Sequence, residues 1–98
     1  MAELRLSRLA GQDLDNIRQT GEAEFGEERA RRHLHGFERV FALLRAHPQS
    51  GQERPEFGPG IRTFSHRPHR LLYRVDGQGV LVLRIVHGAQ ATSRIAIQ

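Results

Sequence analysis

The chain contains no cysteine and no lysine, and it has a single tyrosine. Because it has no thiols, neither a disulfide framework nor a thiolate metal site can form. Because it has no lysine, all 15 basic residues are arginine, which binds phosphates and carboxylates but cannot act as a general base near neutral pH. No segment approaches the roughly 18 apolar residues of a membrane span, and the N-terminal MAELRLSRLAG lacks the apolar centre of a signal peptide. We therefore expect a cytoplasmic protein without a membrane-embedded part.

The length and the charge distribution bound what the protein can be. Its 98 residues suffice for one core, so we expect a single domain over residues 1–98. Residues 1–56 carry nine arginines and ten acidic residues, a net charge of −1, whereas residues 57–98 carry six arginines and only Asp76, a net charge of +5. A cationic surface of this kind attracts nucleic acids or acidic protein segments.

The first half of the chain predicts one strand and two helices. Residues 3–6 alternate as a short strand, and Ser7 is a suitable N-cap for a helix that is expected to weaken at Thr20-Gly21 and to end at Gly26. A second helix follows, ends at Pro48 and carries an apolar stripe. The stripe comprises Ala30, Leu34, Phe37, Phe41 and Leu44. Because the link between the helices is short, they are expected to form an antiparallel hairpin.

The second half predicts three strands after an irregular connection. Residues 48–60 hold three prolines and three glycines, which indicates a loop. Strands are expected at 61–65, 69–75 and 80–87, and residues 88–98 form either a short final strand or an extended arm. The order β-α-α-β-β-β predicts an α+β fold in which a helical hairpin packs on one face of a small antiparallel sheet. Because the last two strands are apolar on both sides, the second face is also expected to be covered.

The turn at residues 76–79 predicts the pairing of the last two strands. The expected pairs are Val75 with Val80, Tyr73 with Val82 and Leu71 with Arg84. Arg84 would then share a sheet face with Tyr73, whereas Arg70 and Arg74 would lie on the other face. His87 follows Arg84 by three residues, so the two side chains act on one group only if the strand ends or bulges between them.

The histidines and arginines raise the question of RNA cleavage. Cleavage through the ribose 2′-hydroxyl requires a general acid, a general base and a cation beside the phosphorane. Arg62 and Arg84 are candidates for the cation. Candidates for the acid and the base are His66, His69, His87, Glu53 and Glu56. Each histidine is equally consistent with a surface or strand-end position, so no catalytic residue is assigned.

Metal and cofactor sites are not expected. His33 and His35 point to different sides of a helix, and His66 and His69 have no carboxylate near them in the sequence. The GPG at 58–60 and the GQG at 77–79 lack the strand-to-helix context of a phosphate-binding loop.

Several short motifs in order resemble the ParE branch of the RelE/ParE toxin superfamily, over nearly the whole chain. The motifs are A-x-x-D-L-x-x-I (Ala10, Asp13, Leu14, Ile17), F-G-x-x-x-A (Phe25, Gly26, Ala30), H-P-x-x-G (His47, Pro48, Gly51), G-I-R-x-F (Gly60, Ile61, Arg62, Phe64), HRLLYRV at 69–75 and RIVHG at 84–88. The resemblance implies a toxin that a cognate antitoxin wraps and neutralises. Gln90 and Ala91 depart from it, because relatives often carry an Arg-Asp pair there.

The resemblance implies DNA gyrase as the target, inhibited by binding, and a ParD-like antitoxin with a ribbon-helix-helix domain. The toxin and the antitoxin would form a hetero-oligomer that contacts DNA only through the antitoxin. RelE-like relatives instead cut messenger RNA on the ribosome with basic residues and a late tyrosine or a His-Tyr pair, but here His87 precedes Gly88. That ribonuclease is one alternative, and a non-toxic protein that only binds an antitoxin is another.

Two sets of residues are proposed for these contacts. The basic surface for the target comprises Arg62, Arg84, His87 and Arg94. The apolar groove for the antitoxin comprises Leu14, Ile17, Phe41, Leu44 and Tyr73, although each of these is also a candidate for the core.

Overall fold

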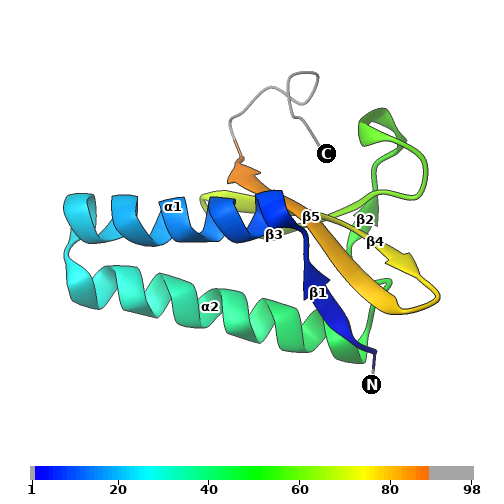
Figure 1. Ribbon diagram of the computed structural model, residues 1–98, viewed down its shortest axis with the longest axis horizontal. Helices are drawn as coiled ribbons and strands as arrows, with labels where there is room; N and C mark the ends of the chain where they lie inside the picture. Colours follow the sequence, from blue (N-terminus) through cyan, green and yellow to red (C-terminus); the bar gives the residue numbers. More distant parts are fainter. Residues whose placement is uncertain (1, 89–98) are drawn as a thin grey trace.

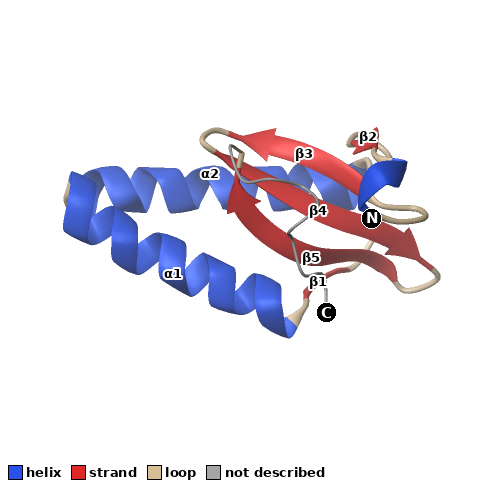
Figure 2. Cartoon of the chain, turned by 90° about the horizontal axis from the view of Figure 1, so that it is seen from above, coloured by secondary structure: helices blue, strands red, loops and turns tan. Residues whose placement is uncertain are grey.

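The computed structural model describes residues 2–88 as two helices on one face of a five-stranded sheet (Figures 1 and 2). The elements are β1 (Leu4–Leu6), α1 (Arg8–Phe25), α2 (Glu27–Ala46), β2 (Gln52–Glu53), a 3-10 turn η1 (Pro55–Phe57), β3 (Arg62–His66), β4 (His69–Asp76) and β5 (Gly79–His87). The predicted α+β class and helical hairpin are confirmed. Within residues 2–88, neither helix is long and apolar enough to cross a membrane.

The sheet is mixed, so the prediction of a purely antiparallel sheet is wrong. Its strand order is β1-β5-β4-β3-β2, and β1 pairs with β5 in parallel. The close approach of β1 requires a glycine at position 79, where φ is 121° and where a Cβ would collide with the carbonyl oxygen of Glu3. The same oxygen accepts a hydrogen bond from Val80 N–H at 2.8 Å, which fixes the parallel register.

The helical hairpin begins and turns as the sequence predicts. The Ser7 hydroxyl caps α1 by accepting a hydrogen bond from Ala10 N–H at 3.0 Å, and Gly26, with φ at 85°, is the only residue between the helices. The expected weak point at Thr20-Gly21 does not occur, because α1 runs unbroken to Phe25. A Cβ on Gly21 would lie 3.3 Å from the Ala30 Cβ, so this glycine lets the two helices pack closely.

The connection at residues 48–60 is more ordered than predicted. It contains β2, which pairs with β3 at the sheet edge, and the 3-10 turn η1. The two-residue length of β2 explains why no alternating pattern revealed it.

The pairing of β4 with β5 is predicted correctly near the turn and wrongly beyond it. Val75 pairs with Val80 and Tyr73 with Val82, but Leu72 pairs with Arg84, because one additional residue, Leu83, bulges from β5. The bulge shifts Arg84 away from the face that carries Tyr73. Arg84 and His87 still lie on opposite faces, because the bulge precedes both of them.

Both faces of the sheet are apolar, as predicted. The face toward the helices contributes to a main core with Phe37, Leu44, Leu71, Tyr73, Val80, Val82 and Ile85. The opposite face contains a second buried cluster of Ile61, Leu72, Leu83 and Val86, against which Phe57 and Leu81 pack. Tyr73 and Leu72 face different cores because successive side chains of a strand point to opposite faces of the sheet.

Candidate functional site

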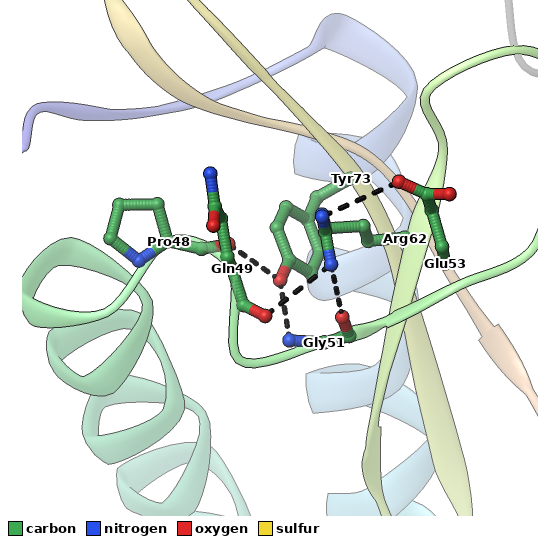
Figure 3. A network of polar contacts seen from close by, with 6 residues as sticks. All are labelled: Pro48, Gln49, Gly51, Glu53, Arg62 and Tyr73. Atoms are coloured by element: carbon green, nitrogen blue, oxygen red, sulfur yellow. Dashed lines mark hydrogen bonds and ion pairs between the residues drawn. The ribbon is translucent and has the colours of Figure 1, made fainter.

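The loop after α2 is fastened to the sheet by Tyr73 (Figure 3). The phenol of Tyr73 donates a hydrogen bond to the Pro48 carbonyl oxygen at 2.8 Å and accepts one from Gly51 N–H at 2.7 Å. Burial raises the pKa of this phenol, and the Gly51 N–H and the Arg62 charge partly offset that effect. The hydroxyl thus has both its donor and its acceptor engaged in holding the loop.

Arg62, at the start of β3, completes this network. Its Nη1 donates to the carbonyl oxygen of Gly51 at 2.8 Å and to that of Gln49 at 3.3 Å, and its Nη2 lies 3.4 Å from Glu53 Oε1 (Figure 3). The guanidinium therefore supplies hydrogen-bond donors to two carbonyl oxygens of the loop. Arg62 thus joins the segment of the G-I-R-x-F motif to Gly51 of the H-P-x-x-G motif.

Arg84 makes a bidentate ion pair with Asp13 of α1. Its Nε donates to Asp13 Oδ2 at 2.7 Å and its Nη2 donates to Oδ1 at 3.0 Å. Asp13 Oδ2 also accepts a hydrogen bond from Ile85 N–H at 2.9 Å, so the carboxylate joins α1 to the edge of β5. The hydrogen bonds to Asp13 raise the pKa of Arg84. The side chains of Arg84 and Asp13 are 17% and 14% exposed, so the pair is largely shielded from solvent.

A cleft of about 500 Å³ lies between the helical hairpin, the β3–β4 turn and the end of β5. Its apolar lining includes Ile17, Phe25, Ala30 and Pro68. Its polar lining comprises Asn16, Thr20, Glu24, Arg29, His33, Arg67, His69 and His87. The cleft thus combines a hydrophobic floor with basic side chains, a combination suited to an apolar and acidic peptide.

Four histidines gather beside this cleft from one helix and three strands. His33 Nε2 and His69 Nδ1 are 2.9 Å apart, and His66 Nε2 lies 2.9 Å from the His33 carbonyl oxygen. The His33 and His66 rings stack with centroids 4.4 Å apart, and the His69 and His87 rings are 5.9 Å apart. Burial, followed by the nearby His33, His87 and His66, lowers the pKa of His69 to about 4. Burial, followed by His66, also lowers the pKa of His33.

The structure does not gather the residues proposed for the basic surface. Arg62 holds the loop at one end of β3, Arg84 pairs with Asp13, and His87 lies beside the histidine group. Arg94, together with Gln90, Ala91 and the possible final strand, lies outside the described residues. The proposed contact of Arg62, Arg84 and His87 with the target stays a prediction, and Arg62 and Arg84 make internal contacts as well.

The residues proposed for the apolar groove divide into two groups. Leu44 and Tyr73 are 0% exposed, so placing them in an exposed groove is wrong, since they belong to the main core. Leu14, Ile17 and Phe41 are partly buried and pack against that core. Of these three, Ile17 also lines the cleft, and its contact with an antitoxin stays a prediction.

Two features of the site were not predicted from the sequence. The pairing of His33 with His69 spans 36 residues, and no local spacing could have revealed it. Asp13 did leave a signal, because it is an acidic residue between Ala10 and Leu14 on the apolar side of α1. Among residues 2–88, no group of three or more histidine, aspartate or glutamate side chains is arranged to hold a metal ion.

A helical hairpin on a mixed sheet, with a basic second half and a cleft beside the hairpin, defines a small α+β protein with features of a macromolecule-binding domain. The family model for the ParE toxin of the type II toxin–antitoxin system parDE matches residues 4–92. Toxin ParE3 of Caulobacter vibrioides is 36% identical over 88 residues, which are 90% of this chain and 88% of that protein.

Further relatives support the same family. Toxin ParE1 of Mycobacterium tuberculosis is 31% identical over 83 residues, 84% of this chain and 85% of that protein. The solved structure of a chromosomal ParDE TA system from P. aeruginosa superposes with a TM-score of 0.76 at 29% identity, over 89% of this chain and 96% of the matched one. The chain therefore belongs to the ParE toxin family of type II toxin–antitoxin systems.

Proposed function

We propose that the protein is a toxin that inhibits DNA gyrase by binding it, and that a ParD-like antitoxin with a ribbon-helix-helix domain neutralises it. Membership of the ParE family supports the toxin role. The name of the solved ParDE system supports an antitoxin partner. The two proteins would form a hetero-oligomer in the cytoplasm, and any contact with DNA would come from the antitoxin.

One observation carries the proposal that the toxin binds its target and does not cleave RNA. The single tyrosine of the chain is 0% exposed, and its hydroxyl is engaged by Pro48 and Gly51. A phenol used as a general acid must reach the substrate, and Tyr73 cannot do so without releasing the loop. Arg62 and Arg84, the candidate cations, likewise hold a loop and a helix in place.

The sheet face away from the helices offers a cationic surface for a partner. Arg70 and Arg74 flank Leu72 on this face, where Arg74 is exposed and Arg70 partly buried. Together with the +5 charge of residues 57–98, these side chains favour a partner with acidic groups. They add to Arg62 and Arg84 as side chains that we expect to meet the target.

The proposal is tested with purified gyrase. We expect the protein to slow supercoiling and to accumulate cleaved DNA–gyrase complexes. The double variant Arg70→Ala/Arg74→Ala is expected to weaken inhibition by at least tenfold, whereas Arg39→Ala, which removes an exposed arginine of α2, should change it by less than about twofold. Full supercoiling with no cleaved complexes at saturating protein would refute the target. Unimpaired growth on expression without an antitoxin would favour the non-toxic alternative.

The second candidate function is that of a ribosome-dependent ribonuclease. The contact between His33 and His69 favours it, because two ring nitrogens 2.9 Å apart can exchange a proton. Against it, the pKa of His69 at about 4 makes this ring a weak base at neutral pH. Programmed ribosomes incubated with the protein distinguish the two functions. Cuts in the messenger RNA that disappear in His69→Gln would overturn the gyrase proposal.

A further inference from the structure

The histidine cluster, defined as His33, His66, His69 and His87, occupies the place where the helical hairpin leaves the sheet. In Figures 1 and 2 the connected ends of α1 and α2 project beyond the β3–β4 turn. His33 lies in α2, near this boundary, and its partners His66 and His69 are the last residue of β3 and the first of β4. The cluster therefore joins the projecting hairpin to the sheet.

The hydrogen bonds of the cluster permit only some protonation states. In the contact between His33 Nε2 and His69 Nδ1, one nitrogen must donate and the other must accept. If both rings are protonated, both nitrogens carry a proton and the contact becomes a repulsion. His66 differs, because its Nε2–H donates to a carbonyl oxygen in the neutral and in the protonated state.

Packing holds the His66 ring of the cluster against α2. A Cβ on Gly36 would collide with the His66 ring, whose Nε2 would be 2.5 Å away, so this ring lies directly on the backbone of α2. The buried Phe37 ring packs in a T-shaped arrangement against the His33 and His66 rings, at centroid distances of 5.0 and 4.5 Å. Turning the His33 or the His69 ring into the cleft breaks the hydrogen bond that joins α2 to β4, and moving α2 away from the β3–β4 turn breaks it too. Either way of relieving a repulsion between His33 and His69 therefore removes this contact between the hairpin and the sheet.

The charges around the cluster do not compensate for added protons. From α1, Glu24 is the one acidic side chain that lines the cleft, and Asn16 and Thr20 are neutral. From α2 and from the β3–β4 turn, Arg29 and Arg67 line it as cations. His87 adds a fourth imidazole from β5. The fixed charges of the cleft lining therefore sum to +1 before any histidine is protonated.

We infer that the histidine cluster is an acid-sensitive latch, closed near neutral pH, whose protonation separates the helical hairpin from the β3–β4 turn and widens the cleft. In the closed state the His33–His69 hydrogen bond bridges the two layers. In the open state the His33 and His69 rings are exposed to solvent and both can carry a proton, and the projecting part of the hairpin is released. The inference concerns the free toxin and stands independently of its target.

Hydrogen exchange of the full-length free protein, followed at residues 30–37 between pH 7.5 and 5, tests the latch. A ring with a pKa of about 4 when closed and 6.5 when open raises the opening equilibrium about 30-fold at pH 5. Solvent screening of a partly exposed ring reduces this to roughly tenfold. His69→Gln, which keeps a hydrogen-bonding group but does not titrate, is expected to change less than twofold. His35→Gln removes an exposed histidine of the same helix and should behave as the parent protein.

A second measurement on the unaltered protein keeps the test decisive if His69→Gln does not fold. The ring resonances of His69, followed by NMR, should stay those of a neutral imidazole down to pH 5. The latch is refuted if the ring titrates with a midpoint near 6.5. It is refuted as well if the opening equilibrium at residues 30–37, taken from exchange rates corrected for the pH dependence of intrinsic amide exchange, is the same at pH 7.5 and 5. It is also refuted if His69→Gln shows the same pH dependence as the parent.

Discussion

The Asp13→Ala substitution removes the carboxylate that joins α1 to the edge of β5. Three hydrogen bonds end on it: two from Arg84, at 2.7 and 3.0 Å, and one from Ile85 N–H at 2.9 Å. The side chain of Arg84, 17% exposed in the parent, would lose its two hydrogen bonds to this carboxylate, and the Ile85 amide would lose the bond to Asp13 Oδ2. The loss of two charge-assisted hydrogen bonds and of one hydrogen bond to a backbone amide is expected to lower the free energy of unfolding by about 2–4 kcal/mol.

A double-mutant cycle with Arg84→Ala separates the ion pair from the amide contact. Urea denaturation of the parent, the two single variants and the double variant gives the coupling between Asp13 and Arg84, which we expect to be about 1–3 kcal/mol. Asp13→Ala should destabilise more than Arg84→Ala, since only the former orphans the Ile85 amide. The reasoning is wrong if the coupling lies below about 0.5 kcal/mol, because the pair would then be an ordinary exposed one.

Three further expectations follow from packing and titration. Gly51→Ala should lower the free energy of thermal unfolding by about 2–3 kcal/mol, because the added Cβ would lie 2.5 Å from the Tyr73 phenol oxygen. Gly77→Ala is the control: its Cβ would have nothing within 4 Å, so stability should change by less than about 0.5 kcal/mol. Gly36→Ala should destabilise by about 1 kcal/mol despite its better helix propensity, whereas Gly11→Ala, in open space on α1, should gain up to about 1 kcal/mol. Because the folded protein lowers the pKa of His69 from 6.5 to about 4, the unfolded chain binds more protons as the pH falls. Above pH 6.5 this shift contributes about 1–2 kcal/mol to the free energy of unfolding, and that contribution should be lost as the pH falls from 6.5 to 4. In His69→Gln the loss over the same pH range should be smaller.

Local patterns in the sequence determine most of the fold. The Ser7 cap, the glycine between the helices and the stripe on α2 each leave a signal within a few residues, and the structure has all three. The parallel pairing of β1 with β5 left no such signal, because it joins Leu4 to Val80 across the whole described chain. The bulge at Leu83 was equally hidden, since an apolar residue on either face of an apolar strand leaves the alternation unchanged.

The candidate site was less predictable than the fold because its side chains act in pairs. Arg62 and Arg84 look like free cations in the sequence, yet their partners lie 11 and 71 residues away. Tyr73 sits mid-strand, where it suggested a groove residue, and its role emerges only when the loop at Pro48 returns to it. Composition therefore predicted a cationic protein correctly but could not tell which cations hold the fold together.

Some arginines make internal contacts and others are exposed, and this difference decides how variants with reduced toxicity are interpreted. Replacing Arg62 releases the loop at Gly51, and replacing Arg84 releases α1, so a loss of toxicity in either variant reports a damaged fold as readily as a lost target contact. Arg74 is exposed and lies on the sheet face away from the hairpin, so its loss should leave the core intact. A target contact is thus established only where activity falls while unfolding free energy stays within about 0.5 kcal/mol of the parent. By that criterion the evidence for a docking face has to come from Arg70 and Arg74, and the ion pair of Arg84 serves as the control for folding.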